Sequence, residues 1–222
     1  MPRAGGVEQT GIVTELGEFR VVEATDSDTD ALLAPRDDSA RWLLARGIDQ
    51  WQPGQVPFSW DRGDDYLAFV LWRAEDRVGT VTILWHDPVI WGEQPVPAGY
   101  IHNLIVARPY GGQGLGLGLL QWAEDYVAES GRSVARLDCG TRSSRLRALY
   151  ESVGYGWVRD QQYPWLGPDL ALVLYEKVLR DDRDRRQPSL WGRLRPGPDD
   201  RLTGTSRMLG DTGHEGAASA ER

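Results

Sequence analysis

Five glycines stand within eight residues, from Gly111 to Gly118, and a leucine-rich apolar segment follows them directly. Glycine is unfavourable inside a helix, but it lets a phosphate group approach the main chain closely. A strand that runs through glycines into a helix presents main-chain N–H groups together with the positive end of the helix dipole. The segment therefore predicts an anion-binding site, and a flexible turn before the helix is the alternative interpretation.

Two common phosphate-binding motifs fail at this glycine-rich segment. Gly111 and Gly116 have the spacing of a P-loop, but Leu117 stands where that motif requires a lysine. A Rossmann fingerprint requires Gly-x-Gly-x-x-Gly, and from each possible first glycine the last position falls on a leucine or a glutamine. Both motifs are therefore rejected on residue identity.

A histidine lies in the strand-like segment that leads into the glycines, "GYIHNLIV". The alternation of side chains along a strand predicts two faces, with Tyr100, His102, Leu104 and Val106 on one and Ile101, Asn103 and Ile105 on the other. An imidazole titrates near neutral pH and can take a proton from an amine directly or through water. His102 is therefore a candidate base, and a hydrogen-bonded residue inside the fold is the alternative.

The segment "VARLDCG" places two further polar side chains at the end of a predicted strand. Asp138 is expected to order water or bind a substrate amine, with a loop-capping role as the alternative. Cys139 is expected to be a small buried apolar residue, because nothing nearby in the sequence lowers the pKa of its thiol.

The apolar spacing predicts the elements that position these residues. Strands are expected from Phe19 and over 99–106, and a hairpin between them turns at Glu75 to Arg77. Pro35 is expected to separate the helix over 39–47 from a shorter one before it. The later elements are helices over 117–130 and 143–154, the second capped by Ser143, and strands over 134–140, 155–158 and 170–179.

This order of elements predicts an α/β fold of the mixed α+β type. We expect a twisted mixed sheet of about seven strands with helices on both faces, in which the strands around the two later helices include a parallel pair. The chain has 222 residues, of which 41% are hydrophobic, so it can bury one full core. The predicted domain spans 19–180, between a disordered segment over 1–18 and a disordered, charged, glycine- and proline-containing tail over 181–222.

Composition also excludes several classes of protein. The single cysteine cannot form an internal disulfide, no apolar run reaches the ~20 residues of a membrane span, and the N-terminus lacks the apolar core of a signal peptide. A cytoplasmic protein that does not associate with membranes is therefore expected. The formal net charge of −8 repels nucleic acid, so no nucleic-acid partner is expected.

The segments around the glycines resemble the GNAT superfamily of N-acetyltransferases. That family binds the pyrophosphate of coenzyme A with the motif Gln/Arg-x-x-Gly-x-Gly/Ala, to which Gly111–Gly116 corresponds, although Gly111 replaces the usual Gln or Arg. Leu104–Tyr110 has the family's strand and loop spacing before the motif, and Leu149–Tyr155, "LYESVGY", matches its tyrosine-containing helix. The resemblance covers residues 19–179 and implies the acyl-CoA N-acyltransferase fold.

The resemblance implies an acyltransferase with acetyl-CoA as its co-substrate and without a metal. It implies direct attack, in a ternary complex, of a primary amine of a small molecule or peptide on the acetyl group. Tyr150 matches the family tyrosine that protonates the leaving thiolate, and a core aromatic residue is the alternative. The implied cofactor-binding residues are Leu104, Ile105, Val106, Gly111, Gly112, Gln113, Gly114, Leu115, Gly116, Leu117 and Ser143, the last in place of a usual asparagine.

The family builds its acceptor pocket from the first helices and the loop that follows them. The implied substrate-binding residues here are Trp51, Tyr100 and Asp138, and for Trp51 a role in covering the core is the alternative. A homodimer is a further expectation, since many relatives dimerise. A catalytically silent CoA-binding module of the same fold is the alternative function. Gly111 and Ser143 favour that module, whereas Tyr150 and His102 oppose it.

Overall fold

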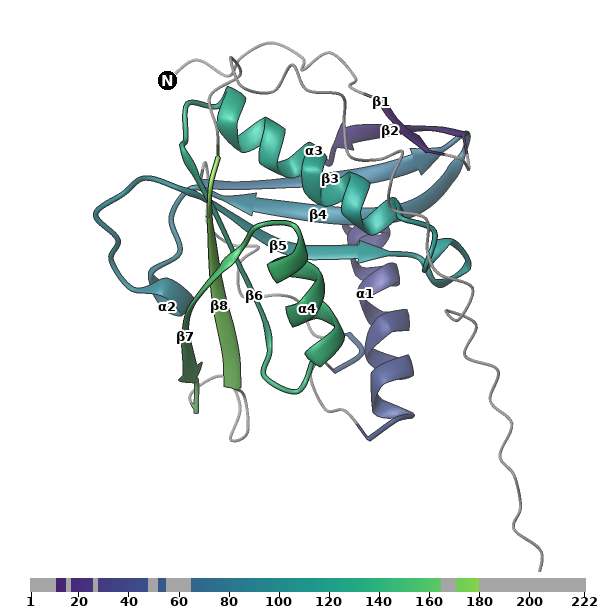
Figure 1. Cartoon of the computed structure of the whole chain (residues 1–222). Helices are drawn as coiled ribbons and strands as arrows, with labels where there is room; N and C mark the ends of the chain where they lie inside the picture. The colour runs from purple at the N-terminus through teal and green to yellow at the C-terminus, as the bar shows by residue number, and fades with distance from the viewer. Residues whose placement is uncertain are drawn as a thin grey trace, which may run out of the picture. The chain divides into compact units, whose positions relative to one another are not determined.

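The computed structural model describes residues 11–14, 17–25, 28–47, 52–54, 65–164 and 171–179. All of them lie in the first of two compact units, Met1–Ser189. They form one eight-stranded sheet in the order β1-β2-β3-β4-β5-β6-β8-β7 (Figure 1). The strands are β1 (Gly11–Thr14), β2 (Gly17–Glu23), β3 (Tyr66–Arg73), β4 (Asp76–Leu84), β5 (Gly99–Val106), β6 (Val134–Gly140), β7 (Gly156–Gln162) and β8 (Ala171–Val178).

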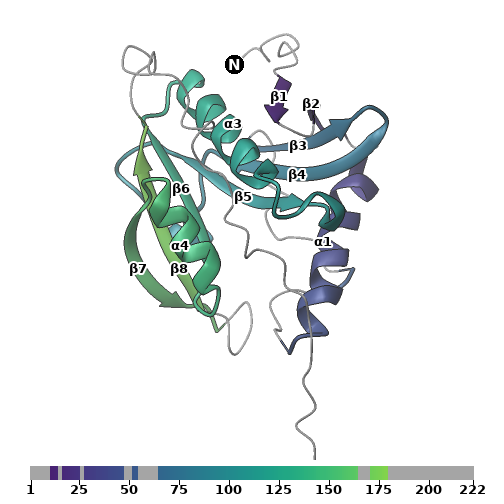
Figure 2. The same cartoon turned by 45° about the vertical axis from the view of Figure 1, so that its right-hand side comes forward.

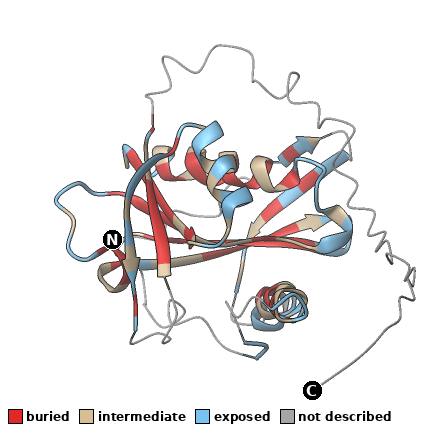
Figure 3. Cartoon of the chain, turned by 60° about the horizontal axis from the view of Figure 1, so that its bottom comes forward, coloured by how far each residue is buried: buried red, intermediate tan, exposed pale blue. Residues whose placement is uncertain are grey.

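Helices cover both faces of this sheet, as predicted. α3 (Leu115–Glu129) packs on β1, β4, β5 and β6, whereas α1 (Thr29–Leu44) packs on β3, β4 and β5 from the opposite side (Figures 1 and 3). α4 (Ser144–Ser152) lies on the α3 face, beside β6 and β8 (Figures 1 and 2). Among the described residues, no helix is both long and apolar enough to cross a membrane.

Alternating side chains of the strands supply a core on each face. Phe69, Leu71 and Ile83 pack with Leu119 under α3. Their neighbours in the strands point the other way: Ala68 and Val70 pack with Leu32 of α1. On that same face, Leu84 and Leu174 pack with Trp91 of the short helix α2 (Pro88–Trp91). Successive side chains of β3 and β4 therefore contribute to different cores, as the period of two along a strand requires.

Two predicted boundaries are wrong. Pro35 does not separate two helices, because α1 runs through it as one helix, and the Ser39 hydroxyl donates a hydrogen bond to the Pro35 carbonyl at 2.8 Å. The sequence predicts disorder up to residue 18, but β1 pairs with β2 and buries Ile12. The side chain of Ile12 fits against Gly118 of α3, where an added Cβ would lie 3.0 Å from it. The tail predicted over 181–222 lies outside the described residues.

The centre of the sheet opens into a fork between β5 and β6. These two strands are parallel, as predicted for the strands around the later helices, and every other pair in the described sheet is antiparallel. Their pairing stops at Ile101 and Leu137, although β5 continues to Val106 and β6 to Gly140. The strands diverge beyond that point (Figures 1 and 2). One edge of β5 is therefore left without a strand partner among the described residues.

A β-bulge sits on β5 beside this fork. Thr82 pairs with His102 and Thr80 with Ile105, so two residues of β5 face one residue of β4. Asn103 takes the left-handed conformation, with φ of 47°, which asparagine tolerates better than most residues. Its side chain donates to the Thr82 hydroxyl, and its carbonyl accepts from the Thr80 hydroxyl, each at 3.2 Å.

The bulge overturns the simple alternation predicted for β5. Leu104 and Val106 pack with Ile101 in the core under α3, not with Tyr100 on the opposite face. The physical reason is that an inserted residue reverses which face the following side chains point to. His102 keeps its predicted face because it precedes the insertion.

Candidate active site

The candidate site begins at the apex of the fork between β5 and β6. Ile101 and Leu137 form the last pair of the two strands, so His102 and Asp138 are the first residues beyond it on either side. The Nδ1 atom of His102 lies 3.6 Å from the Oδ2 atom of Asp138. The fold thus brings together two residues that the sequence singled out separately.

A third side chain reaches the same point from the N-cap of α2. The Nε2 atom of His102 lies 3.1 Å from the Oδ2 atom of Asp87, and the other oxygen of Asp87 accepts from the main-chain N–H of Ile90 at 3.4 Å. A carboxylate can only accept, so Nε2 carries the proton of this hydrogen bond. One imidazole therefore stands between two carboxylates, and we call Asp87, His102 and Asp138 the apex triad.

The apex triad is poorly hydrated. The side chain of Asp87 is 1% exposed, that of His102 12% and that of Asp138 15%. Burial raises the pKa of the Asp138 carboxyl; His102 opposes this shift and the charge of Asp87 adds to it. A carboxyl group in such a setting takes up a proton closer to neutral pH than an exposed aspartate does.

Tyr150 approaches the fork from the other face of the sheet. It lies on α4, packs against the core under α3, and its ring contacts the rings of Tyr155 and Tyr175, with centroid distances of 5.9 and 6.0 Å. Burial raises the pKa of its hydroxyl, with further contributions from Cys139 and from Asp138. The phenol is therefore neutral at physiological pH and can donate its proton.

The glycine-rich loop joins β5 to α3 on the same side of the fork. Gly112 and Gly114 have φ of 73° and 79°, and a Cβ added at either would meet no other described atom within 4 Å. Gly114 is the N-cap of α3 and has no side chain to cap it, so the N–H groups of Leu115, Gly116 and Leu117 have no partner among the described residues. The loop thus presents open main-chain donors at a helix N-terminus.

The remaining predicted site residues have different positions. Tyr100 is 3% exposed and belongs to the core that contains Trp91, and its hydroxyl accepts a hydrogen bond from Arg136 at 2.9 Å. Ser143 is the N-cap residue of α4 but makes no side-chain capping bond, in contrast to the predicted cap. Trp51 lies outside the described residues. Cys139 is buried, and burial raises the pKa of its thiol to about 12, so the thiol stays neutral like the small apolar residue that the sequence predicts.

Sequence reasoning missed one residue of this site, Asp87, and the bulge beside it at Asn103. Asp87 stands directly before Pro88, and an aspartate followed by proline is a recognisable start of a helix. Its contact with His102, 15 residues later, leaves no local signal. The bulge could have been predicted from Asn103, because asparagine is rare inside strands. The described residues contain no group of three or more His, Cys, Asp or Glu placed to hold a metal ion.

Comparison with known proteins identifies relatives of this chain. A model of the acetyltransferase (GNAT) family matches residues 30–155. The chain is also 31% identical over 150 residues to the uncharacterized N-acetyltransferase YesJ of Bacillus subtilis, a match that covers 62% of this chain and 81% of that protein.

Solved structures share the fold. An acetyltransferase of the GNAT family from Listeria monocytogenes superimposes with a TM-score of 0.54 and 23% identity, covering 77% of this chain and all of that one. The GNAT domain of S. lividans PAT superimposes with a TM-score of 0.53 and 16% identity, over 77% of this chain and 97% of that one. At these identities the likeness concerns the fold.

Proposed function

We propose, because this chain belongs to the GNAT acetyltransferase family, that it transfers the acetyl group of acetyl-CoA to a primary amine of a small molecule or peptide. The observation that carries the proposal is the fork between β5 and β6, with the apex triad on one face and Tyr150 on the other. In direct attack, a group that takes the proton of the amine and a group that protonates the leaving thiolate must both lie close to the acetyl carbon, and the fork places the apex triad and Tyr150 on either side of one position.

The described residues fit coenzyme A. Its diphosphate suits the open N–H groups at the start of α3, where Gly112 and Gly114 leave space above the main chain. Its extended arm suits the edge of β5 on the β6 side, from Leu104 to Val106, because that edge has no strand partner among the described residues beyond Ile101. Gly111, Gln113, Leu115, Gly116, Leu117 and Ser143 complete the proposed contacts.

The proposed chemistry assigns a task to each side of the fork. The acceptor loses a proton at the apex triad, where His102 takes part in its removal, and the nitrogen then attacks the acetyl carbon. Main-chain N–H groups of β5 polarise the acetyl oxygen. The C–N bond forms, the C–S bond breaks with its electron pair on sulfur, and the thiolate takes the proton of the Tyr150 hydroxyl. The second proton of the nitrogen restores the phenol, so the products are an amide and free thiol.

Thiol release from acetyl-CoA tests this function. A panel of alkyl monoamines, diamines, amino-acid amides and short peptides is added to the protein, and release above the rate without amine is expected for at least one of them. Calorimetry with coenzyme A measures binding in parallel. Binding without amine-dependent release for any member of the panel contradicts the proposed activity and identifies a silent binding module.

A further inference from the structure

We propose that the carboxylate of Asp138 accepts the amine's proton, that His102 is its charged partner, and that Asp87 is a positioning residue that fixes the His102 ring. The inference rests on the proposed function, since it assigns the proton-removing step of that reaction. The balance of charge, the hydrogen bonds and the exposure of the three side chains all support it.

The apex triad has an unequal balance of charge. Its two carboxylates face one imidazole, so the triad keeps a net charge of −1 even when both ring nitrogens of His102 are protonated. A group of this charge attracts an ammonium ion and has room for one more proton. A single neutral histidine could accept a proton, but it would carry no charge to attract the ammonium ion.

The two carboxylates differ in access. Asp87 is 1% exposed and both of its oxygens are occupied, one by the Nε2 atom of His102 and the other by the N–H of Ile90. Asp138 is 15% exposed and stands at the first position of β6 beyond the last pair with β5. Asp138 is therefore the carboxylate of the triad that can meet a substrate in the fork.

Asp87 fixes the orientation of the ring between the carboxylates. Its bond to Nε2 leaves Nδ1 as the nitrogen that faces Asp138, and the cap to Ile90 fixes the carboxylate itself. The 3.6 Å between Nδ1 and the Asp138 oxygen is too long for a strong direct hydrogen bond, so the interaction is mainly electrostatic. Asp138 consequently keeps a lone pair for the incoming amine or for a water between them.

The neighbours of the triad do not compete for this proton. Tyr150 of α4, Cys139 of β6 and Tyr163, which follows β7, are the other titratable groups that interact with Asp138. Burial raises the pKa of each, to about 12 for Cys139 and for Tyr163, so all three stay neutral at physiological pH. Asp138 itself has a raised pKa despite the opposing effect of His102.

The ammonium ion gives up one proton to Asp138 before its nitrogen attacks. The ammonium nitrogen breaks one N–H bond, its electron pair becomes the nucleophile, and the proton forms an O–H bond on Asp138. After release of the amide and the thiol, this proton passes to solvent. No oxidant or further reactant is required.

The signs of two pH shifts test the assignment in the full chain. The rate with the most active amine of the panel, at saturating acetyl-CoA, rises with pH as the base loses its proton. His102→Gln removes a charge that lowers the pKa of Asp138, so this acidic limb is expected to move to higher pH. Asp87→Asn removes a charge that raises it, so the limb is expected to move to lower pH. Asp138→Asn is expected to lower the rate about a hundredfold and to abolish the limb, while Asp138→Glu restores part of it.

The assignment would be overturned if the Asp138→Asn variant kept the wild-type acidic limb. It would also be overturned if the His102→Gln variant lost the limb while the Asp138→Asn variant kept it. Carbon NMR of the side-chain carboxyl groups in the free protein tests it without any turnover. A carboxyl signal that titrates above the ordinary range of aspartate, vanishes in Asp138→Asn and titrates at lower pH in Asp87→Asn is expected. If Asp138 titrates in the ordinary range, the assignment is wrong whether or not the protein transfers acetyl groups. If the signal behaves as expected but no amine is acetylated, only the proposed function fails.

Discussion

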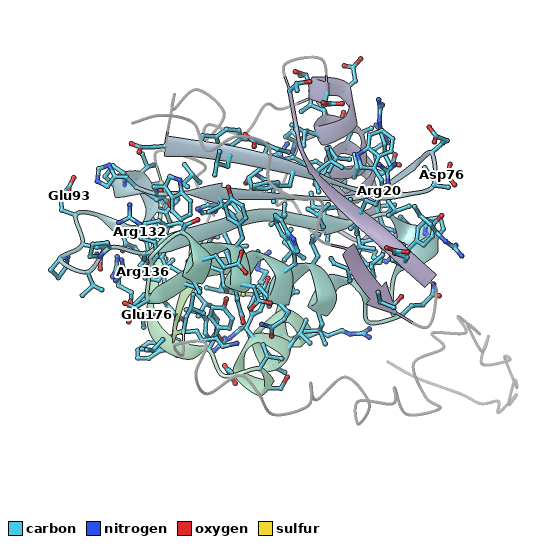
Figure 4. The ribbon with its side chains drawn as sticks, turned by 90° about the horizontal axis from the view of Figure 1, so that it is seen from above. Arg20, Asp76, Glu93, Arg132, Arg136 and Glu176 are labelled. Carbon is cyan, nitrogen blue, oxygen red and sulfur yellow. The ribbon has the colours of Figure 1, made fainter. Side chains whose placement is uncertain are left out.

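Two regions of the sheet bury charged side chains, and they do so in opposite ways. In the first half of β6, Arg136 is 3% exposed and forms a 2.8 Å ion pair with Glu176 of β8 (Figure 4). Its guanidinium also donates to the Tyr100 hydroxyl and to the Val96 carbonyl. At the apex triad, two carboxylates share one imidazole. Charge is matched in the first region and left in excess in the second.

This difference indicates that the first region contributes to stability and the second to the proposed chemistry. A buried charge whose hydrogen bonds are all made holds the fold in place and has no capacity to exchange protons. A buried excess of negative charge costs stability and shifts the pKa of a carboxyl toward neutral pH. We therefore expect substitutions in the first region to change the free energy of unfolding, and substitutions around the fork to change the rate.

The largest expected effect concerns Tyr150, on the α4 side of the fork. Tyr150→Phe removes the hydroxyl that is proposed to protonate the thiolate but keeps the ring contacts with Tyr155 and Tyr175. Turnover is expected to fall about a hundredfold or more, with unchanged affinity for coenzyme A by calorimetry. Tyr175→Phe is the matched control, since its hydroxyl already donates to Glu151 at 2.7 Å. Equal turnover in wild type and Tyr150→Phe rules out the role.

The next effect concerns the matched region. Arg136→Met removes the ion pair with Glu176 and leaves the Tyr100 hydroxyl without its donor. The free energy of unfolding is expected to fall by about 2 kcal/mol, because hydrogen bonds to charged groups contribute that order of stability. Urea denaturation measures this. The turnover of the folded fraction is expected to stay at the wild-type value, and a selective loss of turnover would show that Arg136 takes part in the chemistry and not only in stability.

A smaller effect is expected in the glycine-rich loop. Gly114→Ala forces a side chain into φ of 79° and is expected to destabilise the fold by about 1 kcal/mol while weakening coenzyme A binding. Gly116→Ala is the matched control, because its added Cβ would meet only Val106, at 3.9 Å, and its φ is not positive. We expect that variant to be at least as stable as wild type, because alanine is the better helix residue, and to lose only affinity, since its Cβ lies where the diphosphate is proposed to bind. Unchanged affinity in both variants argues against a diphosphate at this loop.

The smallest expected effect is a pH-dependent gain in stability when Asp138 is replaced by asparagine. Folding raises the pKa of Asp138, so its contribution to stability is fully present below the unfolded pKa and is lost as the pH rises through the folded value. The amide side chain of the Asp138→Asn variant cannot ionise. That variant is therefore expected to unfold at a higher temperature than wild type at about pH 8 and at the same temperature at about pH 4.

Glu176→Gln provides the contrast to that substitution. It removes a charge that is matched by Arg136, so it is expected to lower the unfolding temperature at neutral pH. If both variants shift the temperature in the same direction, the distinction between matched and excess charge fails.

The sequence predicts most of the fold because periodicity is a local property. The bounds of β5 and β6, the hairpin of β3 and β4, and the parallel pairing across α3 all follow from apolar spacing and glycine stops. Errors arise where a tertiary contact decides the outcome. β1 depends on pairing with β2 and on the close fit of Ile12 against Gly118, which no window of four residues can reveal.

The candidate site was predictable only in part, for the same reason. His102, Asp138 and Tyr150 were singled out by residue type and by resemblance, and the fold brings the first two to within 3.6 Å. Asp87 lies in the connection between β4 and β5 and joins the triad through its contact with His102, 15 residues later. Neither this contact nor the burial of the Asp87 side chain leaves a local signal in the sequence. For Tyr100 the sequence did not reveal that its hydroxyl accepts a hydrogen bond from Arg136, because the two residues lie 36 positions apart.

A crystal structure of the protein with coenzyme A tests the central claim most directly. We predict that the diphosphate lies against Gly112 to Gly116, that the arm pairs with the free edge of β5, and that the sulfur sits in the fork between Tyr150 and Asp138. Coenzyme A bound elsewhere, or β5 and β6 closed into a continuous ladder beyond Ile101 and Leu137, would contradict it.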